Sequence, residues 1–283
     1  ALSCLVAARV SRADVLHGSK HMDLGLKGLS ALVTASSKGL GRATALQLAR
    51  EGARVTICAR GREALEGTRA EIAALGAEVL AVPVDLADPG AAQALVDATV
   101  ARFGQLDLLI GNAGGPPPGG FLSLDERAWE AAIQLTLMSF VRLCHAAIPA
   151  IRRSSHGSIL AFTSMSVKQP LPDLVLSNSL RLAVTGLVKS LADELGPDGV
   201  RVNAICPGWT RTDRVEQLLR DRAARDGSTP EAEAARIAEA IPLGRMATPD
   251  EFARAAAFLV SPAASYVHGV SLLVDGGFYR GTM

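Results

Sequence analysis

The chain has 283 residues, of which 49% are hydrophobic and 20% are charged, and its net charge is +1. This composition provides a sizeable apolar core, and no extended basic block is present to suggest binding to nucleic acid or to a membrane surface. No run of residues approaches the roughly 18 to 20 apolar residues of a membrane span. We therefore expect a globular protein that binds neither nucleic acid nor membrane.

The four cysteines are scattered, and no two of them form a C-x-x-C pair. Neither a zinc site nor a disulfide framework is expected from this spacing, so no metal is predicted. The pattern is typical of reduced cysteines in a cytoplasmic protein.

Residues 1–21 precede the first periodic pattern and are expected to lie outside the fold. The preferred interpretation is that Met22 is the native start and that residues 1–21 are an upstream extension or a cloning remnant, because His21-Met22 suits a cloning junction. A transit peptide stays open as an alternative, whereas the missing basic segment before residues 1–8 does not favour a signal peptide.

From Ser30 onward, short runs rich in Val, Ile and Leu alternate with stretches of helical spacing. The strand-like runs are residues 30–35, 54–59, 78–85, 106–114, 157–164, 200–208 and 269–277. Strands this apolar are covered on both faces, and the alternation with helices indicates a parallel sheet. The expected fold is one α/β domain over residues 22–283, with a doubly wound, seven-stranded parallel sheet and helices on both faces.

Residues 211–247 break this alternation. They are charged and helical in composition, and the sequence Gly-Ser-Thr-Pro-Glu interrupts them. We predict a mobile flap that can close over a substrate of moderate size.

The turn after the first strand reads T-A-S-S-K-G-L-G-R-A over residues 34–43. Two glycines open a helix directly after a strand, where backbone N–H groups and the positive helix end can hold a pyrophosphate. The alternative is a turn that serves tight packing only. The candidate cofactor-binding residues here are Ser36, Ser37, Lys38, Gly39, Leu40 and Gly41.

Arg60 ends the second strand, 19 residues after Gly41. Dinucleotide folds contact the adenosine ribose at an offset of roughly 20 residues, where an acid would bind the 2′-hydroxyl of NAD. An arginine instead suits the 2′-phosphate of NADP(H), and Lys38 would add a second positive charge. The alternative is that Arg60 only begins the next helix in solvent.

Three more turns carry candidate cofactor residues at the same edge of the sheet, which is where ligands bind open α/β sheets. Small residues after the fourth strand let the backbone approach a nucleotide. An acid after the third strand can accept from an adenine amino group, or it can cap a helix starting near Asp88. Hydroxyls after the sixth strand can meet a nicotinamide carboxamide. These candidates are Asp85, Leu86, Asn112, Ala113, Gly114, Pro207, Gly208 and Thr212.

From about Leu24 to Gly277 the chain resembles the classical short-chain dehydrogenase/reductases, and in pattern it is similar to 3-oxoacyl-(acyl-carrier-protein) reductases. The resemblance rests on four motifs in the family's order and spacing: TASSKGLG, GNAG, VRVNAICPG and SYVHGVSLLVDGG. It implies a Rossmann-like fold, a nicotinamide cofactor, and a homotetramer or homodimer built on the long helices after the fourth and fifth strands.

The resemblance also implies four catalytic positions, and only one of them keeps the family's residue. The family's serine matches Ser164. Its tyrosine position, 13 residues later, is Ser177, and its lysine position is Arg181. Its asparagine position, seven residues after Trp129, is Thr136.

Ser177 differs from a tyrosine in acidity. A phenol has a pKa of about 10, whereas an aliphatic hydroxyl is closer to water at roughly 15.7, a gap worth about 8 kcal/mol. Ser177 is therefore not expected to donate a proton directly, and Arg181 contributes only charge, to the nicotinamide ribose or to a substrate carboxylate or phosphate. Lys168 and Asp173 are the candidate proton donors; otherwise both are solvated loop charges.

Three functions fit these residues. The favoured one is an NADP(H)-dependent oxidoreductase with a non-standard proton relay, which reduces a carbonyl such as a 3-oxoacyl thioester or oxidises an alcohol. The second is a non-redox enzyme in which Ser164, Ser177 and Arg181 polarise the substrate. The third is a catalytically silent sensor of NADPH, or a partner subunit of an active homologue.

Overall fold

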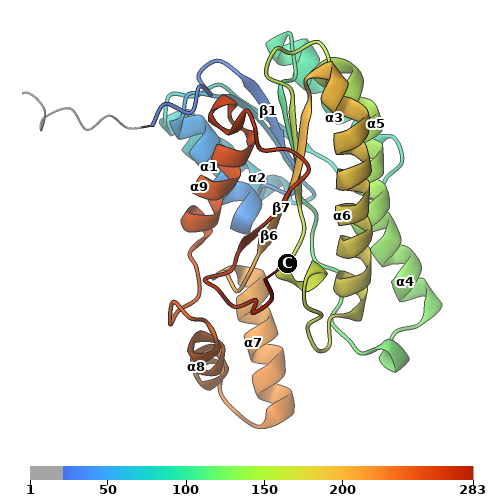
Figure 1. Ribbon diagram of the computed structural model, residues 1–283, viewed down its shortest axis with the longest axis vertical. Helices are drawn as coiled ribbons and strands as arrows, with labels where there is room; N and C mark the ends of the chain where they lie inside the picture. The colour runs from blue at the N-terminus through green and yellow to red at the C-terminus, as the bar shows by residue number, and fades with distance from the viewer. Residues whose placement is uncertain (1–21, 283) are drawn as a thin grey trace, which may run out of the picture.

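One parallel sheet of seven strands organises residues 22–282, the part of the chain that the computed structural model describes (Figure 1). The strands are β1 (Ser30–Val33), β2 (Arg54–Ala59), β3 (Val79–Pro83), β4 (Leu108–Gly111), β5 (Ser158–Phe162), β6 (Arg201–Pro207) and β7 (Ser271–Val274). Their order is β3-β2-β1-β4-β5-β6-β7, and every neighbouring pair is parallel. The predicted doubly wound, Rossmann-like sheet is confirmed. The predicted extension, residues 1–21, lies outside the described residues.

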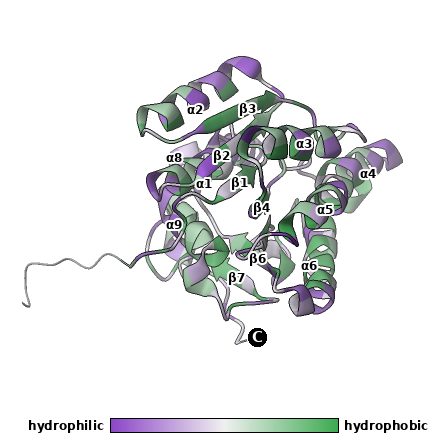
Figure 2. Cartoon of the chain, turned by 90° about the horizontal axis from the view of Figure 1, so that it is seen from above, coloured by the Kyte–Doolittle hydropathy of each residue, from purple (hydrophilic) through white to green (hydrophobic). Residues whose placement is uncertain are grey.

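Helices cover both faces of the sheet (Figure 2). One face carries α1 (Gly39–Arg50), α2 (Arg62–Ala74) and α9 (Pro249–Val260). The other face carries α3 (Ala91–Phe103), α5 (Ser139–Ile151) and α6 (Val175–Leu195). This arrangement explains why the strands are apolar along their whole length, since neither face meets water.

Alternate side chains of each strand enter opposite halves of the core. Leu32 of β1 and Leu109 of β4 pack on the side of α3, α5 and α6. Their neighbours Val33 and Ile110 pack on the side of α1 and α9. All four are fully buried, and burial of one such side chain contributes roughly 1.5–3 kcal/mol relative to exposure. A slip of one residue would exchange the two cores, so the register of the central strands is strongly specified.

Between β4 and β5, α4 (Glu126–Ala132) continues through one π-helical segment (Ile133–Met138) into α5. Within residues 22–282 this helical stretch, Glu126–Ile151, is long and apolar enough to span a membrane by length and composition, with a mean hydropathy of 1.5. The core helix of a globular protein meets the same criterion. Phe140, Leu143 and Ile151 are buried in the core of the sheet, as such a helix requires.

The predicted flap contains α7 (Asp213–Asp226) and α8 (Pro230–Ala240), which lie beyond the carboxyl ends of the strands (Figure 1). Gly227 ends α7 in the left-handed conformation with φ 65°, and the hydroxyl of Thr229 caps α8. The interruption expected from the sequence therefore separates two helices. Four apolar residues of the flap are buried together with Trp209 and Met165; these are Leu219, Ile237, Ile241 and Met246. The mobility of the flap stays a prediction.

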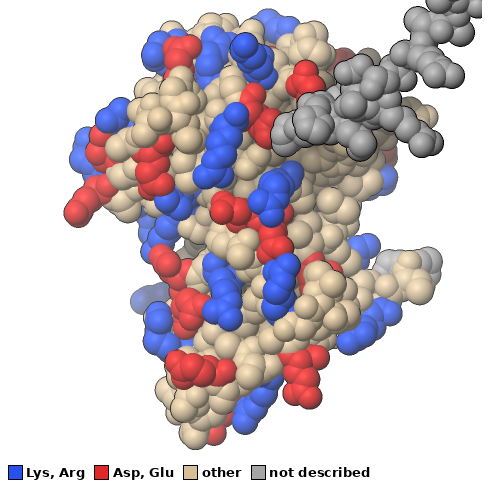
Figure 3. Space-filling model, turned by 90° about the vertical axis from the view of Figure 1, so that its left-hand side faces the viewer, with Lys and Arg blue, Asp and Glu red and all other residues tan. Residues whose placement is uncertain are grey.

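The charged side chains are mixed in sign on the face that Figure 3 shows. Lys and Arg lie beside Asp and Glu, and no continuous basic patch covers this face. Ion pairs of the described chain include those between Arg42 and Glu71 and between Arg245 and Glu251.

Candidate active site

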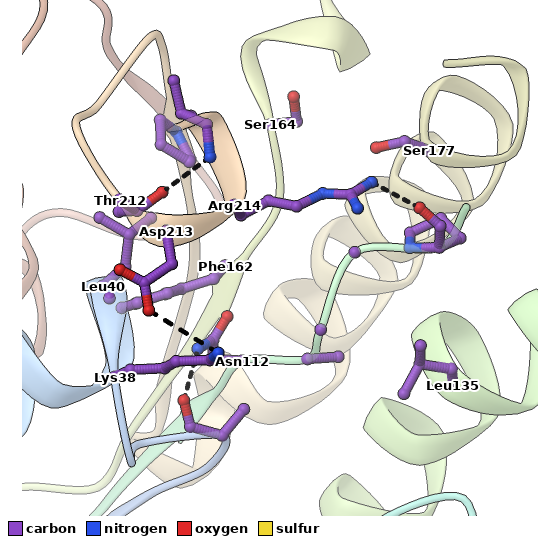
Figure 4. Close-up of a pocket in the computed structure, with 18 of the residues that line it drawn as sticks. Lys38, Leu40, Asn112, Leu135, Phe162, Ser164, Ser177, Thr212, Asp213 and Arg214 are labelled. Carbon is purple, nitrogen blue, oxygen red and sulfur yellow. Dashed lines mark hydrogen bonds and ion pairs between the residues drawn. The ribbon is translucent and has the colours of Figure 1, made fainter. Parts of the chain in front are cut away.

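A cavity of about 650 Å³ opens at the carboxyl edge of the sheet, between the strand ends, α6 and α7. This volume is within the range of small-molecule and cofactor sites. Most of the residues that the sequence singled out line it (Figure 4). They are Ser37, Lys38, Gly39, Leu40, Arg60, Asp85, Leu86, Asn112, Ala113, Gly114, Ser164, Ser177, Arg181, Pro207, Gly208 and Thr212. Ser36 and Gly41, also singled out, are not among the lining residues.

Ser36 joins two strands instead. Its hydroxyl is buried, donates to the carbonyl oxygen of Val33 at 2.8 Å and accepts from the N–H of Cys58 at 3.0 Å. These bonds tie the end of β1 to β2. The prediction of Ser36 as a cofactor ligand is therefore corrected to a structural role, because its only hydroxyl is already satisfied inside the core.

Gly41 allows α1 to approach the turn before it. A Cβ at Gly41 would lie 2.4 Å from the carbonyl oxygen of Ala35 and 2.9 Å from Nδ2 of Asn112. Nδ2 of Asn112 also donates to Ala35 O at 3.2 Å, so the three residues form one tight contact. Ala35 has φ 47°, the left-handed conformation that glycine adopts without strain. Gly41 thus shapes the turn without lining the cavity itself.

The N-terminus of α1 faces the cavity without a side-chain cap. Lys38 is the N-cap residue and makes no capping bond, and both Gly39 and Leu40 line the cavity. Free N–H groups at a helix start favour an anion such as a pyrophosphate. Nζ of Lys38 lies 3.7 Å from Oδ2 of Asp213 on α7 (Figure 4). The start of α1 therefore suits the pyrophosphate of a dinucleotide. The charge of Lys38 is paired with Asp213 of α7, whereas the sequence predicted that it would add to the charge of Arg60.

Arg60 and Asp85 lie side by side at the ends of β2 and β3. Nη1 of Arg60 is 3.9 Å from Oδ2 of Asp85. Oδ1 of Asp85 accepts from the N–H of Ala87 at 3.0 Å. The N-cap of α3 is Gly90, so the alternative in which Asp85 caps the next helix is wrong. Arg60 belongs to the cavity wall, as a 2′-phosphate ligand would require.

Ser164, Ser177 and Arg181 meet at the other end of the cavity. Ser164 follows β5, and its hydroxyl accepts from the N–H of Ser166 at 3.1 Å. Ser177 and Arg181 come from the first two turns of α6, one helical turn apart on one face. Figure 4 shows Ser164, which follows β5, and Ser177, on α6, beside the same space.

Arg181 is held by the backbone at the end of β5. Its Nη1 donates to the carbonyl oxygens of Phe162 at 3.0 Å and Thr163 at 3.2 Å. Burial lowers the pKa of Arg181 from 12.5 to about 10, and the positive charge of Arg214 lowers it in the same direction. The guanidinium remains protonated at neutral pH, so Arg181 supplies charge and cannot act as an acid there.

Arg214 is a functional candidate that the sequence did not reveal. It lies in the first turn of α7, lines the cavity, and donates from Nη2 to the carbonyl oxygen of Pro116 at 2.7 Å (Figure 4). Burial lowers the pKa of Arg214 as well. No periodic pattern marks this residue, since its contact joins positions 98 residues apart.

The two predicted proton donors do not line the cavity. Oδ2 of Asp173 pairs with Nη1 of Arg225 at 2.8 Å, which ties the loop before α6 to α7. Lys168 is exposed on the same loop. The carboxylate of Asp173 is thus directed to α7, and the alternative of a loop charge describes it better. Tyr266 is fully exposed and also lies outside the cavity wall.

Within residues 22–282 no three His, Cys, Asp or Glu side chains gather as a metal site would require. The described cysteines are unpaired and buried. Burial raises the pKa of Cys58 and Cys144 to about 12, so neither thiol is a nucleophile at neutral pH.

A family model described as enoyl-(acyl carrier protein) reductase matches residues 34–279, nearly the whole of the described chain. The chain belongs to the short-chain dehydrogenase/reductase family. A solved short-chain dehydrogenase/reductase of Serratia marcescens, a double mutant, has a TM-score of 0.81 and 29% identity to it, over 90% of this chain and all of that one.

Two further relatives carry more specific names. L-rhamnose 1-dehydrogenase (NAD(P)(+)) of Azotobacter vinelandii is 35% identical over 88% of this chain and 95% of its own length. L-sorbose reductase of Gluconobacter frateurii, solved in complex with NADPH and L-sorbose, has a TM-score of 0.87 and 32% identity. That match covers 92% of this chain and all of the reductase.

In this short-chain dehydrogenase/reductase, Thr136 stands at the family's asparagine position and does not line the large cavity. Thr136 belongs to the π-helical segment, and its buried hydroxyl has no hydrogen-bond partner in the described structure. It borders a separate cavity of about 10 Å³, as does Arg181. A space of this size approaches that of one water molecule. The sequence did not predict the π-helical segment, which interrupts an otherwise regular helical pattern.

Proposed function

We propose that this protein is an NADP(H)-dependent oxidoreductase that reduces a carbonyl compound or oxidises the corresponding alcohol. The observation that carries the proposal is that one cavity joins Arg60 and the open start of α1 to Ser164 and Ser177. A dinucleotide laid along this edge would reach from the first group to the second. The relatives that are named as dehydrogenases and reductases, and the reductase solved with NADPH, support the same function.

The chain's residues fit NADP(H) along the whole cavity. The free N–H groups at the start of α1 would hold the pyrophosphate, and Arg60 would bind the 2′-phosphate with its fixed pair of donors. Asp85 and Leu86, which line the cavity beside Arg60, would flank the adenine. Gly114 lies where a Cβ would meet no atom within 4 Å, so the backbone there can be approached closely. The residues at the nicotinamide end would be Pro207, Gly208 and Thr212.

NADPH, when bound, supplies a hydride to a carbonyl carbon. The chain itself would stabilise the negative charge that develops on the carbonyl oxygen. The hydroxyls of Ser164 and Ser177 can donate hydrogen bonds to that oxygen, and the nearby cation Arg181 lowers the energy of the charged state. Loss of one such donor reduces turnover by about 10²–10³-fold in other enzymes.

The proton that completes the alcohol would come from water. A serine hydroxyl is too weak an acid, and Arg181 stays protonated. No tyrosine or histidine is among the described residues that line the cavity. The acidic and lysine side chains of the wall are Lys38, Asp85 and Asp213, and Asp213 is paired with Lys38 of the dinucleotide turn. One proton from water and one hydride then balance the reduction of the carbonyl to the alcohol.

A second function has one observation in its favour. Nη1 of Arg181 is already bound to the carbonyl oxygens of Phe162 and Thr163, and Ser177 replaces the family's acid. A protein that binds NADPH without turnover, as a sensor or as the partner subunit of an active homologue, would have this arrangement.

NADPH titration combined with NADPH oxidation tests both proposals. The carbonyl panel should include ketones, hydroxyketones, oxo acids and 3-oxoacyl thioesters. Saturable binding with oxidation of NADPH by at least one carbonyl supports the oxidoreductase. Binding without oxidation by any of them supports the sensor or partner subunit, and absence of binding contradicts both. The predicted homodimer or homotetramer and cytoplasmic location stay predictions.

A further inference from the structure

Two arginines lie together at the end of the cavity that holds the serines. Arg181 and Arg214 both line it, and they are close enough for the charge of Arg214 to lower the pKa of Arg181. Neither forms an ion pair with an Asp or Glu of the described chain. Their hydrogen bonds go to backbone carbonyl oxygens only, of Phe162 and Thr163 in one case and of Pro116 in the other.

This arrangement is electrostatically unfavourable without a bound anion. Two like charges repel, and partial burial removes the water that would screen them. Arg214 also lies in the first turn of α7, where the helix dipole disfavours a cation. Several arginines elsewhere have carboxylate partners, whereas Arg201 bonds only to backbone carbonyl oxygens but has no second arginine of the described chain lining a cavity beside it. The pairs are Arg42 with Glu71, Arg152 with Asp198, and Arg245 with Glu251. An anion between Arg181 and Arg214 would relieve the repulsion.

The position of Arg214 is fixed by its neighbours across the cavity. Nη2 is bonded to Pro116 O, and a Cβ on Gly115 would lie 3.0 Å from Nε and 3.3 Å from Cζ. The missing side chain at Gly115 thus makes room for the guanidinium. Figure 4 shows Arg214 reaching from α7 into the space beside Ser164 and Ser177. One bond to Pro116 leaves further N–H donors for a carboxylate, which a guanidinium binds through two parallel bonds.

Apolar side chains also line this end of the cavity, beside the hydroxyls of Thr163 and Thr210. The wall around the serines carries six apolar side chains: Met165, Leu171, Leu174, Trp209, Val215 and Leu218. Trp209 belongs to the buried cluster that joins the cavity to α7 and α8, and its ring is stacked by Arg222 at 4.9 Å. A ligand that fills this space must therefore be partly apolar.

From these contacts we infer that the substrate is an oxo acid, a carbonyl compound with a free carboxylate and an apolar remainder. This inference rests on the proposed oxidoreductase function. The carboxylate binds Arg214, next to the charge of Arg181. The carbonyl oxygen then lies at Ser164 and Ser177, and the apolar remainder packs on the wall around Trp209. A neutral 3-oxoacyl thioester would bring no negative charge to either arginine, and the charge of Asp221 acts on Arg214 only from beyond ion-pair distance.

The test compares matched pairs of oxo acids and their methyl esters, with the carboxylate at different distances from the carbonyl. For wild type, kcat/KM should be about 10- to 100-fold higher for the best acid than for its ester, the usual effect of a charge-assisted hydrogen bond. Arg214→Met should bring the ratio of acid to ester close to one. Gly115→Ala, which keeps the arginine but displaces it, should lower the ratio as well. Arg222→Met is the matched control, since Arg222 contacts Trp209 without lining the cavity, and it should keep the wild-type ratio.

The outcomes separate this inference from the proposed function. Turnover of esters and thioesters as efficient as that of acids would overturn the oxo acid and leave the oxidoreductase standing. If no carbonyl is reduced, the oxidoreductase fails, and ligand binding decides the remaining part of the inference, that the two arginines bind a carboxylate. Saturable quenching of Trp209 fluorescence by a straight-chain carboxylate supports it. The amide of the same acid should not quench the wild-type protein, and the carboxylate should not quench the Arg214→Met variant. The Trp209→Phe variant identifies the signal, because Trp129 is the other tryptophan. Equal quenching by acid and amide, or quenching by neither, would overturn the inference.

Discussion

Nη1 of Arg60 lies 3.9 Å from Oδ2 of Asp85, at the carboxyl ends of neighbouring strands. The side chain of Arg60 is 78% exposed, and such a pair contributes little free energy, so the guanidinium is available to a phosphate. We expect Arg60→Asp to weaken NADPH binding by about 10- to 100-fold and to change NADH binding much less. The Kd of each cofactor, measured by fluorescence titration, checks this.

Arg62→Asp is the matched control for that experiment. Arg62 is exposed in α2 and does not line the cavity, and its substitution changes the net charge by the same amount. It should leave the ratio of the two affinities near the wild-type value. An unchanged ratio in Arg60→Asp would remove the 2′-phosphate assignment.

Gly41 and Gly67 should respond in opposite ways to the same substitution. Gly41→Ala places a methyl group 2.4 Å from Ala35 O, so it should lower the free energy of unfolding by about 1–3 kcal/mol and weaken NADPH binding. Gly67 lies in α2 with no atom within 4 Å of its Cβ position, and Gly67→Ala should raise the free energy of unfolding by about 0.5–1 kcal/mol. Urea unfolding of both variants measures the difference. Similar destabilisation by both would contradict the tight turn.

Ser177→Tyr should increase turnover. It places a phenol, an acid about six pKa units stronger than an aliphatic hydroxyl, at the same point of α6. A positioned general acid typically contributes 10²–10⁴-fold, so kcat for the best carbonyl should rise by at least about tenfold. Ser177→Phe introduces a ring of nearly the same volume as that of tyrosine but without the hydroxyl, and it should not raise kcat. Equal effects of Tyr and Phe would show that the cavity responds to size rather than to acidity.

Glu251 should make the stability of the protein depend on acid pH. Hydrogen bonds from Arg245 and from the N–H of Thr248, at the start of α9, lower the pKa of Glu251 to about 2. The unfolded value is about 4.3, so the stabilisation is complete above that pH and is lost as the pH falls towards 2. Glu251→Gln should therefore have a lower Tm than wild type at pH 7, and the gap should narrow between pH 4 and pH 2. A gap that stays constant over this range would contradict the assignment.

The sheet and the edge that carries the site were predictable from the sequence, because both depend on local patterns. Continuous apolar runs between amphipathic stretches indicate parallel strands, and each observed strand lies within its predicted run. Turn residues such as Gly39 and Asn112 come to one edge because parallel strands all end there.

The side-chain directions were not predictable, because they depend on long-range contacts. Ser36 points into the core, since Ala35 has a positive φ and Cys58 of the next strand offers a partner. Asp173 is paired with an arginine 52 residues further along the chain. Arg214 enters the cavity through a bond to Pro116, and nothing near it in the sequence marks that direction.

The proposed transfer of a hydride between NADP(H) and a carbonyl compound is tested most directly with NADPH that carries deuterium at the transferable position. The labelled cofactor is incubated with the protein and the carbonyl panel, and each alcohol product is analysed by mass spectrometry and for stereochemistry. We expect one deuterium on the carbinol carbon of at least one product, in one configuration, above a control without protein. Tight binding of NADPH with no deuterium in any product would contradict it and would favour the sensor or partner subunit.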